Sequence, residues 1–337
     1  MSFERRRIEW RGRADSVSVL TFMPRFPSRL AMFRDGGRWW VDVFLPDAAR
    51  IEYRLEIRRG HLVETTLDPD NPDVASNPFG VNSVLVGSNY AAALRCQGRW
   101  QIEDFRIASS AFGGRRQHRL LSPTGVAPDV EMPLVVLHDG SDYLAHAGID
   151  QVLACGLEAG ALPPVRLVLL DPRRRNVEYA ADARHAIHVT QEVLPRLRER
   201  VAVGSRVVAV GASLGAVASW HAAWTHPGVF NGLVLQSGTF AFGSHSEIPP
   251  TMAASLRSFL DLALDEPRTD DVDIGQSCGR YESLIDWNRQ VAALLERRAK
   301  SHRYRETWTG HDWGAWADVF LSSLAFVLGA PSRAPGE

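Results

Sequence analysis

The stretch 207–216, with the sequence VVAVGASLGA, constrains the fold of this chain more than any other. A largely β-branched run, 207–210, leads directly into Gly211-Ala212-Ser213-Leu214-Gly215, and small residues typical of a helix follow over 216–224. In so sharp a turn between strand and helix, only small side chains fit on either side of the serine. The pattern therefore predicts that the Ser213 hydroxyl stands above a sheet, beside helix amides that stabilise an anion. A glycine-rich turn without catalytic function is the alternative for so short a motif.

Length and composition indicate an ordinary globular protein. The chain has 337 residues, 45% hydrophobic and 23% charged, which is enough for two domains and at least one large core. A formal charge of −1 gives no bias toward nucleic acid or membrane surfaces, so neither is expected as a partner. The first residues are basic but no apolar stretch follows them, and no run of 18 apolar residues occurs. We therefore expect a cytoplasmic protein.

The three cysteines, Cys96, Cys155 and Cys278, are too few and too scattered to suggest a disulfide framework. No C-x-x-C motif or cluster of His and Cys suggests a metal site. The cysteines are therefore expected to be reduced core residues. Neither a metal nor a cofactor is expected.

Residues 1–104 are predicted to form an immunoglobulin-like β-sandwich. Short alternating segments at 17–22, 39–45 and 51–57 are rich in β-branched and aromatic residues and are separated by turn residues. The following stretch, 67–85, is rich in Pro, Asn and Asp and is expected to be a surface loop.

Residues 105–337 are predicted to form an α/β domain with a doubly wound sheet. A hairpin is expected first, and then nearly continuous apolar strands alternate with helices. The expected hairpin is 102–108 with 116–121; the later strands are 132–138, 165–171, 207–210, 232–236, 272–276 and 304–308; and the helices are 141–159, 181–200, 216–225 and 283–300. Ligands collect at the C-terminal ends of strands in such sheets, and Ser213 lies at one of these ends.

A general base is predicted in the loop after the last strand, at His311 in Thr309-Gly310-His311-Asp312-Trp313. A serine hydroxyl is a poor nucleophile until an imidazole takes its proton, and α/β-hydrolases carry the histidine at this place in the order serine, acid, histidine. Glu282 is the first candidate for the acid and Asp286 the second. Glu282 could instead simply begin the next helix. Asp312 is expected to brace the loop.

An oxyanion hole needs two backbone N–H groups aimed at the developing charge. Leu214, directly after the serine, is expected to supply one, and Asp139 or Gly140, in the loop after strand 132–138, the other. An ordinary polar turn is the alternative interpretation of His138-Asp139-Gly140.

Several segments taken together resemble the enterochelin esterase family, a group of esterase-D-like α/β-hydrolases with an N-terminal β-domain. The matching segments are Leu137-His138-Asp139-Gly140, Leu170-Asp171, Arg175-Asn176-Val177-Glu178, Glu192-Val193-Leu194-Pro195, Val210 to Gly215, Gln236-Ser237-Gly238, Gly279-Arg280-Tyr281-Glu282 and Gly310-His311-Asp312-Trp313. The resemblance implies hydrolysis of catecholate siderophore esters. It assigns the catalytic roles to Ser213, His311 and Glu282.

Candidate substrate contacts follow from this implied substrate. Arg173, Arg174 and Arg175 could bind a strongly anionic ferric catecholate, or could form a solvated loop. Trp313 and Trp316 could stack on an aromatic acyl group, or could pack in the last helix.

The chain is therefore predicted to be a serine carboxylic ester hydrolase that acts on a small-molecule ester. A general carboxylesterase, a feruloyl- or acetyl-type esterase and an acyltransferase use the same catalytic groups and remain alternatives. A non-catalytic binding protein on a hydrolase fold is a further alternative. The sequence does not determine the oligomeric state.

Overall fold

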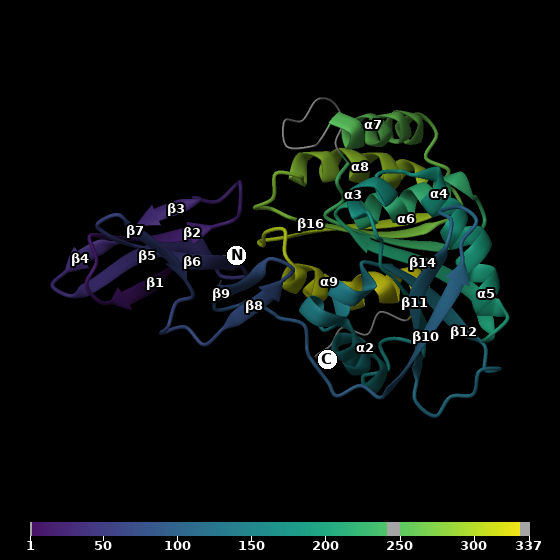
Figure 1. Ribbon diagram of the computed structural model, residues 1–337, viewed down its shortest axis with the longest axis horizontal. Coiled ribbons are helices and arrows are strands. Elements are labelled where there is room, and N and C mark those ends of the chain that lie inside the picture. Colours follow the sequence, from purple (N-terminus) through teal and green to yellow (C-terminus); the bar gives the residue numbers. More distant parts are fainter. Residues whose placement is uncertain (1, 241–249, 331–337) are drawn as a thin grey trace.

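The computed structural model describes residues 2–240 and 250–330 and shows two lobes joined side by side (Figure 1). The N-terminal lobe consists of strands only, whereas the larger lobe holds a central sheet covered by helices on both faces. No helix in these described ranges is long and apolar enough to cross a membrane.

The N-terminal lobe is a sandwich of two antiparallel sheets. One sheet has the order β1-β5-β4, and the other has the order β3-β2-β6-β9-β8 with β7 paired to β6. The strands are β1 (Phe3–Arg11), β2 (Ser16–Thr21), β3 (Arg29–Ala31), β4 (Phe33–Asp35), β5 (Arg38–Pro46), β6 (Arg50–Arg59), β7 (Leu62–Thr66), β8 (Val74–Asn77) and β9 (Gly80–Val86).

Alternation along the strands builds the core of this sandwich. Trp39, Val41 and Val43 on β5 are buried, and their side chains pack in one cluster with Val19 of β2 and Leu55 of β6. Successive side chains on a strand point to opposite faces, so one face of each sheet lines the core. The expected β-sandwich is therefore confirmed, including its three predicted strands.

Two features of this lobe were not expected from the sequence. Strand β1 lies in the basic N-terminal stretch, where Ile8 and Trp10 alternate with charged residues and point into the core. The expectation that 67–85 is a loop is wrong, because its second half forms β8 and β9. Pairing of β9 with β6 satisfies the backbone groups of this polar stretch, and that long-range contact outweighs its weak strand propensity.

The larger lobe contains an eight-stranded sheet with the order β10-β11-β13-β12-β14-β15-β16-β17. In this order, the neighbours from β13 onward pair in parallel. The hairpin β10-β11 is antiparallel, and β11 also pairs antiparallel with β13. The strands are β10 (Trp100–Ala108), β11 (Arg115–Pro123), β12 (Met132–His138), β13 (Arg166–Leu170), β14 (Val203–Ala212), β15 (Gly232–Gln236), β16 (Asp273–Gly279) and β17 (Ser301–Thr307). The predicted α/β-hydrolase sheet is thus confirmed. The proposed domain boundary at 104 falls inside β10.

Helices cover both faces of this sheet (Figure 1). One apolar cluster joins α2 and α9 to the sheet, and a second joins α6, α7 and α8 to its other face. The helical segments are α1 (Gly140–Asp142), the π-helical η1 (Tyr143–Ala147), α2 (Ile149–Glu158), α3 (Arg175–Glu178), α4 (Ala183–Ile187), the π-helical η2 (His188–Val193), α5 (Leu194–Arg198), α6 (Leu214–Thr225), α7 (Pro250–Asp265), α8 (Ile285–Arg298) and α9 (Trp313–Leu328). Helix α7 was not expected.

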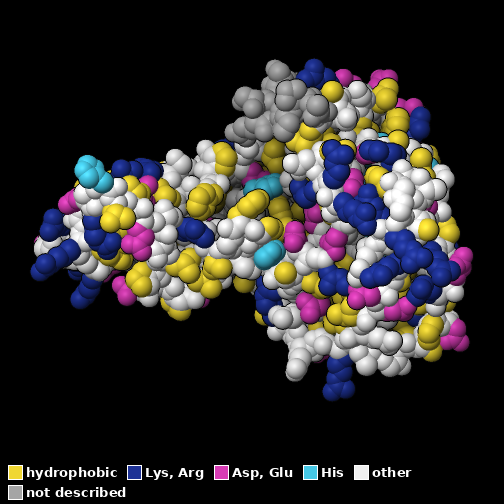
Figure 2. Space-filling model, in the orientation of Figure 1, with side chains coloured by type: hydrophobic (Ala, Val, Ile, Leu, Met, Phe, Trp, Pro, Cys, Tyr) yellow, Lys and Arg dark blue, Asp and Glu magenta, His cyan; other side chains and the backbone are white. Residues whose placement is uncertain are grey.

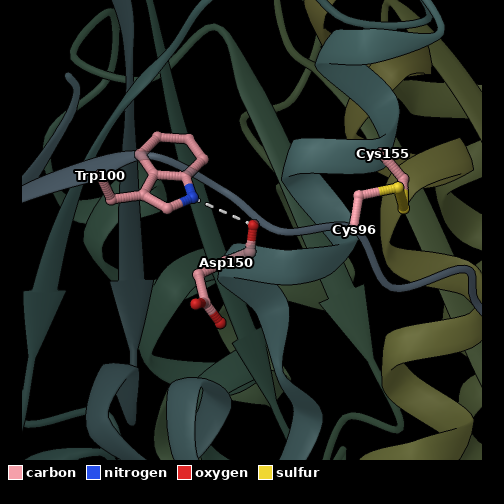
Figure 3. Close-up of a disulfide and its surroundings, with 4 residues drawn as sticks. All are labelled: Cys96, Trp100, Asp150 and Cys155. Atoms are coloured by element: carbon pink, nitrogen blue, oxygen red, sulfur yellow. Dashed lines mark hydrogen bonds between the residues drawn. A yellow bond between two sulfur atoms is a disulfide. The ribbon is translucent and has the colours of Figure 1, made fainter.

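The structure corrects the expectation that all three cysteines are reduced. Cys96, in the segment between the lobes, forms a disulfide with Cys155 of α2, and their Cα atoms are 5.0 Å apart (Figure 3). Trp100 Nε1 donates a hydrogen bond of 3.1 Å to the carbonyl oxygen of Asp150 beside it. Cys278 is a buried free thiol. Sequence spacing could not reveal the pair, because the fold alone brings the two positions together.

Candidate active site

Ser213 lies between the last residue of β14 and the first residue of α6. Its backbone has φ 58° and ψ −122°, a conformation with positive φ that a residue with a side chain rarely adopts. Its amide donates to the carbonyl of Gln236 at 2.9 Å, which holds the turn against β15. The side chain is half-buried, and its Oγ lies 3.1 Å from Thr239 Oγ1. The strained turn therefore presents the hydroxyl at the C-terminal edge of the sheet.

Space requires a glycine at 211 and leaves little room for a side chain at 215. A Cβ at Gly211 would lie 2.2 Å from the backbone of Gly215, so the strand and the helix could not approach each other. A Cβ at Gly215 would lie 3.3 Å from His138 Cβ on the neighbouring strand β12. The close approach explains the glycine spacing seen in the sequence.

His311 and Glu282, from two separate loops, meet in a short hydrogen bond. His311 Nδ1 lies 2.7 Å from Glu282 Oε2, and the glutamate is 2% exposed whereas the imidazole side chain is 36% exposed. A carboxylate at Nδ1 fixes the ring orientation and leaves Nε2 as the nitrogen available to accept a proton. In the described ranges, the hydrogen-bond partner of the Ser213 hydroxyl is Thr239 rather than His311. Catalytic hydrogen bonds of this kind often tighten only when substrate binds.

Ser237 supports the glutamate, and sequence reasoning did not single it out as a site residue. Glu282 Oε1 accepts hydrogen bonds from Ser237 Oγ at 2.6 Å and from the amide of Gly279 at 2.7 Å. Trp316 Nε1 donates to the same serine oxygen at 2.9 Å, and the ring of Trp316 also meets the His311 ring edge to face at 4.9 Å. The sequence signal that could have indicated Ser237 was its position directly after the predicted strand 232–236. In the structure its backbone adopts φ 46°.

Asp286, the second candidate for the acid, has other partners. Its carboxylate pairs with Arg25 and with Arg289 near the surface. Glu282 is the carboxylate that contacts the imidazole of His311.

The amides expected to form the oxyanion hole lie at two helix starts. Leu214 is the first residue of α6, so helix geometry leaves its N–H without an intrahelical acceptor. The Asp139 amide donates to Tyr179 Oη at 3.1 Å, which makes the following Gly140 the better candidate of the pair. A Cβ at Gly140 would lie 2.5 Å from Leu169 Cβ, so only glycine fits there.

The three arginines after β13 do not form one free cationic cluster. Arg175 binds the buried carboxylate of Asp139 at 2.8 Å; burial raises the pKa of that carboxyl group, and the arginine acts in the opposite direction. Arg173 lines a surface cavity of about 590 Å³ together with Arg116, Arg119 and Ser141. Arg174 is exposed. Lys and Arg side chains gather on this larger lobe (Figure 2).

Trp313 is buried and packs in the apolar cluster that joins α9 to the sheet. Its ring packs edge to face on Tyr143 at 5.1 Å and on Trp316 at 4.8 Å, with 9% of the residue exposed. These contacts agree with the packing alternative given for the two tryptophans. No group of three or more His, Cys, Asp and Glu side chains in the described part of the chain could hold a metal ion.

The sheet, the strained turn at Ser213 and the hydrogen-bonded pair of His311 and Glu282 together define an α/β-hydrolase. A family model described as "Putative esterase" matches residues 109–327. The chain therefore belongs to this esterase family, whose class of activity is carboxylic ester hydrolysis.

Individual relatives include enterobactin esterases and a ferulic acid esterase. The iron(III) enterobactin esterase of Escherichia coli O6:H1 is 25% identical over 218 residues, which is 60% of this chain and 51% of that enzyme, so the match spans about half the length of the relative. The ferric enterobactin esterase of Salmonella typhimurium has a similar structure, with a TM-score of 0.81, 20% identity and coverage of 97% of this chain and 94% of the other. A ferulic acid esterase matches with a TM-score of 0.57 and 16% identity over 68% of this chain and 98% of its own. The resemblance to enterochelin esterases is confirmed at the level of the family.

Proposed function

We propose that this chain is a serine esterase that works through an acyl-enzyme on Ser213. The observation that carries the proposal is the 2.7 Å hydrogen bond between His311 and Glu282, on the same edge of the sheet as the strained serine turn. Glu282 follows strand β16 and His311 follows strand β17. Together with Ser213 they give the chain order serine, acid, histidine that α/β-hydrolases use.

The proposed reaction has two steps. In the first, Ser213 Oγ attacks the ester carbonyl carbon while His311 Nε2 takes the hydroxyl proton, and the N–H groups of Leu214 and Gly140 bind the oxyanion. The ester C–O bond then breaks, and the alcohol leaves with the proton from the imidazolium. In the second step, water gives a proton to the imidazole and attacks the carbonyl carbon of the acyl-enzyme. The bond between Ser213 Oγ and the acyl carbon then breaks, the carboxylic acid leaves, and the imidazolium returns its proton to Ser213 Oγ. Glu282 orients the ring and stabilises its charged form throughout.

We propose an ester of a catecholate siderophore, in its ferric form, as the substrate class. The relatives named as enterobactin esterases share the fold of both lobes, whereas the ferulic acid esterase covers a smaller part of this chain. In the described ranges Arg175 has a carboxylate partner, Asp139, whereas Arg173 and Arg174 have none, although Arg173 Nη2 donates to the carbonyl of Arg115 at 2.5 Å. The charges of Arg173 and Arg174 are therefore the ones that could attract an anionic ligand. Turnover of ferric catecholate esters against p-nitrophenyl butyrate in an R173Q/R174Q variant tests this. The preference for the anionic ester should fall, and an unchanged preference would contradict the role of the arginines.

Activity on simple esters tests the serine mechanism. Ser213→Ala should lower kcat/KM for p-nitrophenyl acetate by about 10⁴-fold or more, as removal of a triad nucleophile does. Ser258→Ala, an exposed serine on α7, is the matched control and should keep wild-type rates. Equal rates in Ser213→Ala and wild type would instead favour a binding protein on a hydrolase fold.

The proposed cytoplasmic location makes a separate prediction. Glutathione and thioredoxin keep cytoplasmic thiols reduced, whereas the structure pairs Cys96 with Cys155 in a disulfide. The cytoplasmic location therefore requires that this disulfide is absent in the cell and that both cysteines are alkylated in freshly lysed cells without added reductant. A fully oxidised pair would contradict the cytoplasmic location and favour an oxidising compartment.

A further inference from the structure

We propose that Arg50 of the N-terminal lobe is a positioning residue for His311, acting through the neighbouring Asp312. The inference rests on the proposed role of His311 as the base. It gives the β-sandwich a part in catalysis that the hydrolase lobe alone would lack.

Arg50 joins the two lobes through a buried charge network. The residue begins β6 and is 6% exposed, and its guanidinium donates to Asp312 Oδ1 and to Glu52 Oε1, the latter at 2.9 Å. Glu52 Oε2 accepts a further hydrogen bond of 2.8 Å from Asn82 on β9. One guanidinium therefore faces two carboxylates that have little access to water, and each depends on it for compensation of its charge.

Asp312 links this network to the start of α9. Its Oδ1 accepts a hydrogen bond of 2.8 Å from the amide of Ala315 and so caps the helix. The same oxygen receives the guanidinium of Arg50. Because Asp312 directly follows His311, the ion pair fixes the backbone next to the imidazole.

The residues around His311 contact the sandwich at three further points. The amide of Arg50 donates to the carbonyl of Trp308 at 2.9 Å. A Cβ at Gly314 would lie 2.6 Å from Arg50 Nη2, and a Cβ at Gly310 would lie 2.7 Å from Met23 Cγ. The loop therefore lies against the N-terminal lobe on both sides of the histidine. Histidine side chains are visible at the junction of the lobes in Figure 2.

The geometry explains why this support would matter for the reaction. His311 is held on one side by Glu282 but stands on an exposed loop, and its Nε2 must meet Ser213 on a different segment. A misplacement of about 1 Å in such a group can cost about 100-fold in rate. Arg50 supplies a second fixed point, because it holds Asp312, the residue that directly follows His311.

Arg50→Met tests the inference, because methionine keeps much of the side-chain volume and removes the charge. Arg25→Met is the matched control, since Arg25 also makes an ion pair between the lobes, with Asp286, but at the surface. Asp312→Asn is the second arm, because asparagine still caps a helix while the ion pair with Arg50 is lost. Hydrolysis of p-nitrophenyl butyrate, labelling of Ser213 by a fluorophosphonate and amide hydrogen exchange over 309–316 are measured for each variant.

The expected result is a fall in kcat of about tenfold or more for Arg50→Met, with KM nearly unchanged and slower labelling of Ser213. Asp312→Asn should behave alike, and the double variant should be no slower than Arg50→Met, because the two residues act as one unit. Exchange over 309–316 should rise in Arg50→Met and stay at the wild-type rate in Arg25→Met. If Arg50→Met does not fold, Arg50→Lys replaces it and should show an intermediate kcat.

Two results would overturn the inference. One is a folded Arg50→Met protein with wild-type kcat and wild-type exchange over 309–316, and the other is an equal loss in Arg25→Met. Failure of the proposed function looks different, since Ser213→Ala would then keep its activity whatever Arg50 does to the exchange of the loop.

Discussion

Replacing Glu282 by glutamine should reverse the tautomer of His311 while leaving the fold intact. Oε1 of the glutamate accepts from Ser237 Oγ and from the amide of Gly279, and the amide has no alternative but to donate. The glutamine oxygen must therefore take the Oε1 position, and its NH₂ group must face His311 Nδ1. The imidazole can then accept at Nδ1 only if its proton sits on Nε2, the nitrogen that should take the proton of Ser213.

The size of the loss follows from this geometry. The wrong tautomer at a triad histidine lowers kcat by about 10⁴-fold, which corresponds to about 5.4 kcal/mol of transition-state stabilisation. Every buried hydrogen-bonding group around residue 282 keeps a partner, so the free energy of unfolding should change by only about 1 kcal/mol. Steady-state hydrolysis of p-nitrophenyl butyrate and urea denaturation measure the two effects separately.

Asp286→Asn is the matched control for this prediction. Asp286 pairs with arginines near the surface, and such pairs contribute little, so this variant should keep wild-type rates. Glutamine at 282 with near wild-type kcat would refute the reasoning, and so would an equal loss in the asparagine variant at 286.

Three further predictions follow. Ser237→Ala should lower kcat/KM by about 10- to 100-fold, since a hydrogen bond to a carboxylate contributes about 1.5–3 kcal/mol, and Ser322→Ala on the surface of α9 is its control; equal rates in the two variants would contradict it. Burial lowers the pKa of His118 to about 3 and that of His138 to about 4. The free energy of unfolding is therefore unaffected by these groups above about pH 6.5 and falls as the pH drops toward their pKa values, because the unfolded chain then binds protons that the folded chain does not. Between pH 8 and pH 5 each histidine should lower the free energy of unfolding by about 2 kcal/mol, and equal urea midpoints at the two pH values would contradict this. Cys96→Ser opens a loop with a sequence separation of 59 and should destabilise the oxidised protein by about 4 kcal/mol in thermal or urea unfolding, whereas the reduced wild type should match the variant.

The sequence was sufficient to predict the parts of the fold that depend on local pattern. The continuous apolar strands, the hairpin across Phe112 to Gly114 and the turn at Ser213 all lie where their periodicity places them. Covered parallel strands and tight glycine turns leave such local signatures because their residues meet fixed steric demands.

Features that depend on contacts between distant residues could not be predicted in the same way. Strand β9 exists because it pairs with β6, and Cys96 reaches Cys155 only after the segment between the lobes has docked on α2. The engagement of Arg175 by Asp139 also arises from packing, so a run of arginines in the sequence overstated the free positive charge.

The candidate site shows the same division. Chain order and the family resemblance pointed to Ser213, His311 and Glu282, and the hydrogen bond between the last two agrees with that choice. The roles of Ser237 and Arg50 depend on side chains that approach from other elements, and no spacing rule in the sequence connects them to the histidine.

Mapping of a covalent fluorophosphonate adduct tests the central claim most directly, because the reagent reacts with a serine that a neighbouring base has activated. The proposed mechanism predicts a single adduct, located on Ser213, and labelling that is nearly abolished in His311→Ala. An adduct on another residue, or equal labelling rates in wild type and His311→Ala, would contradict it.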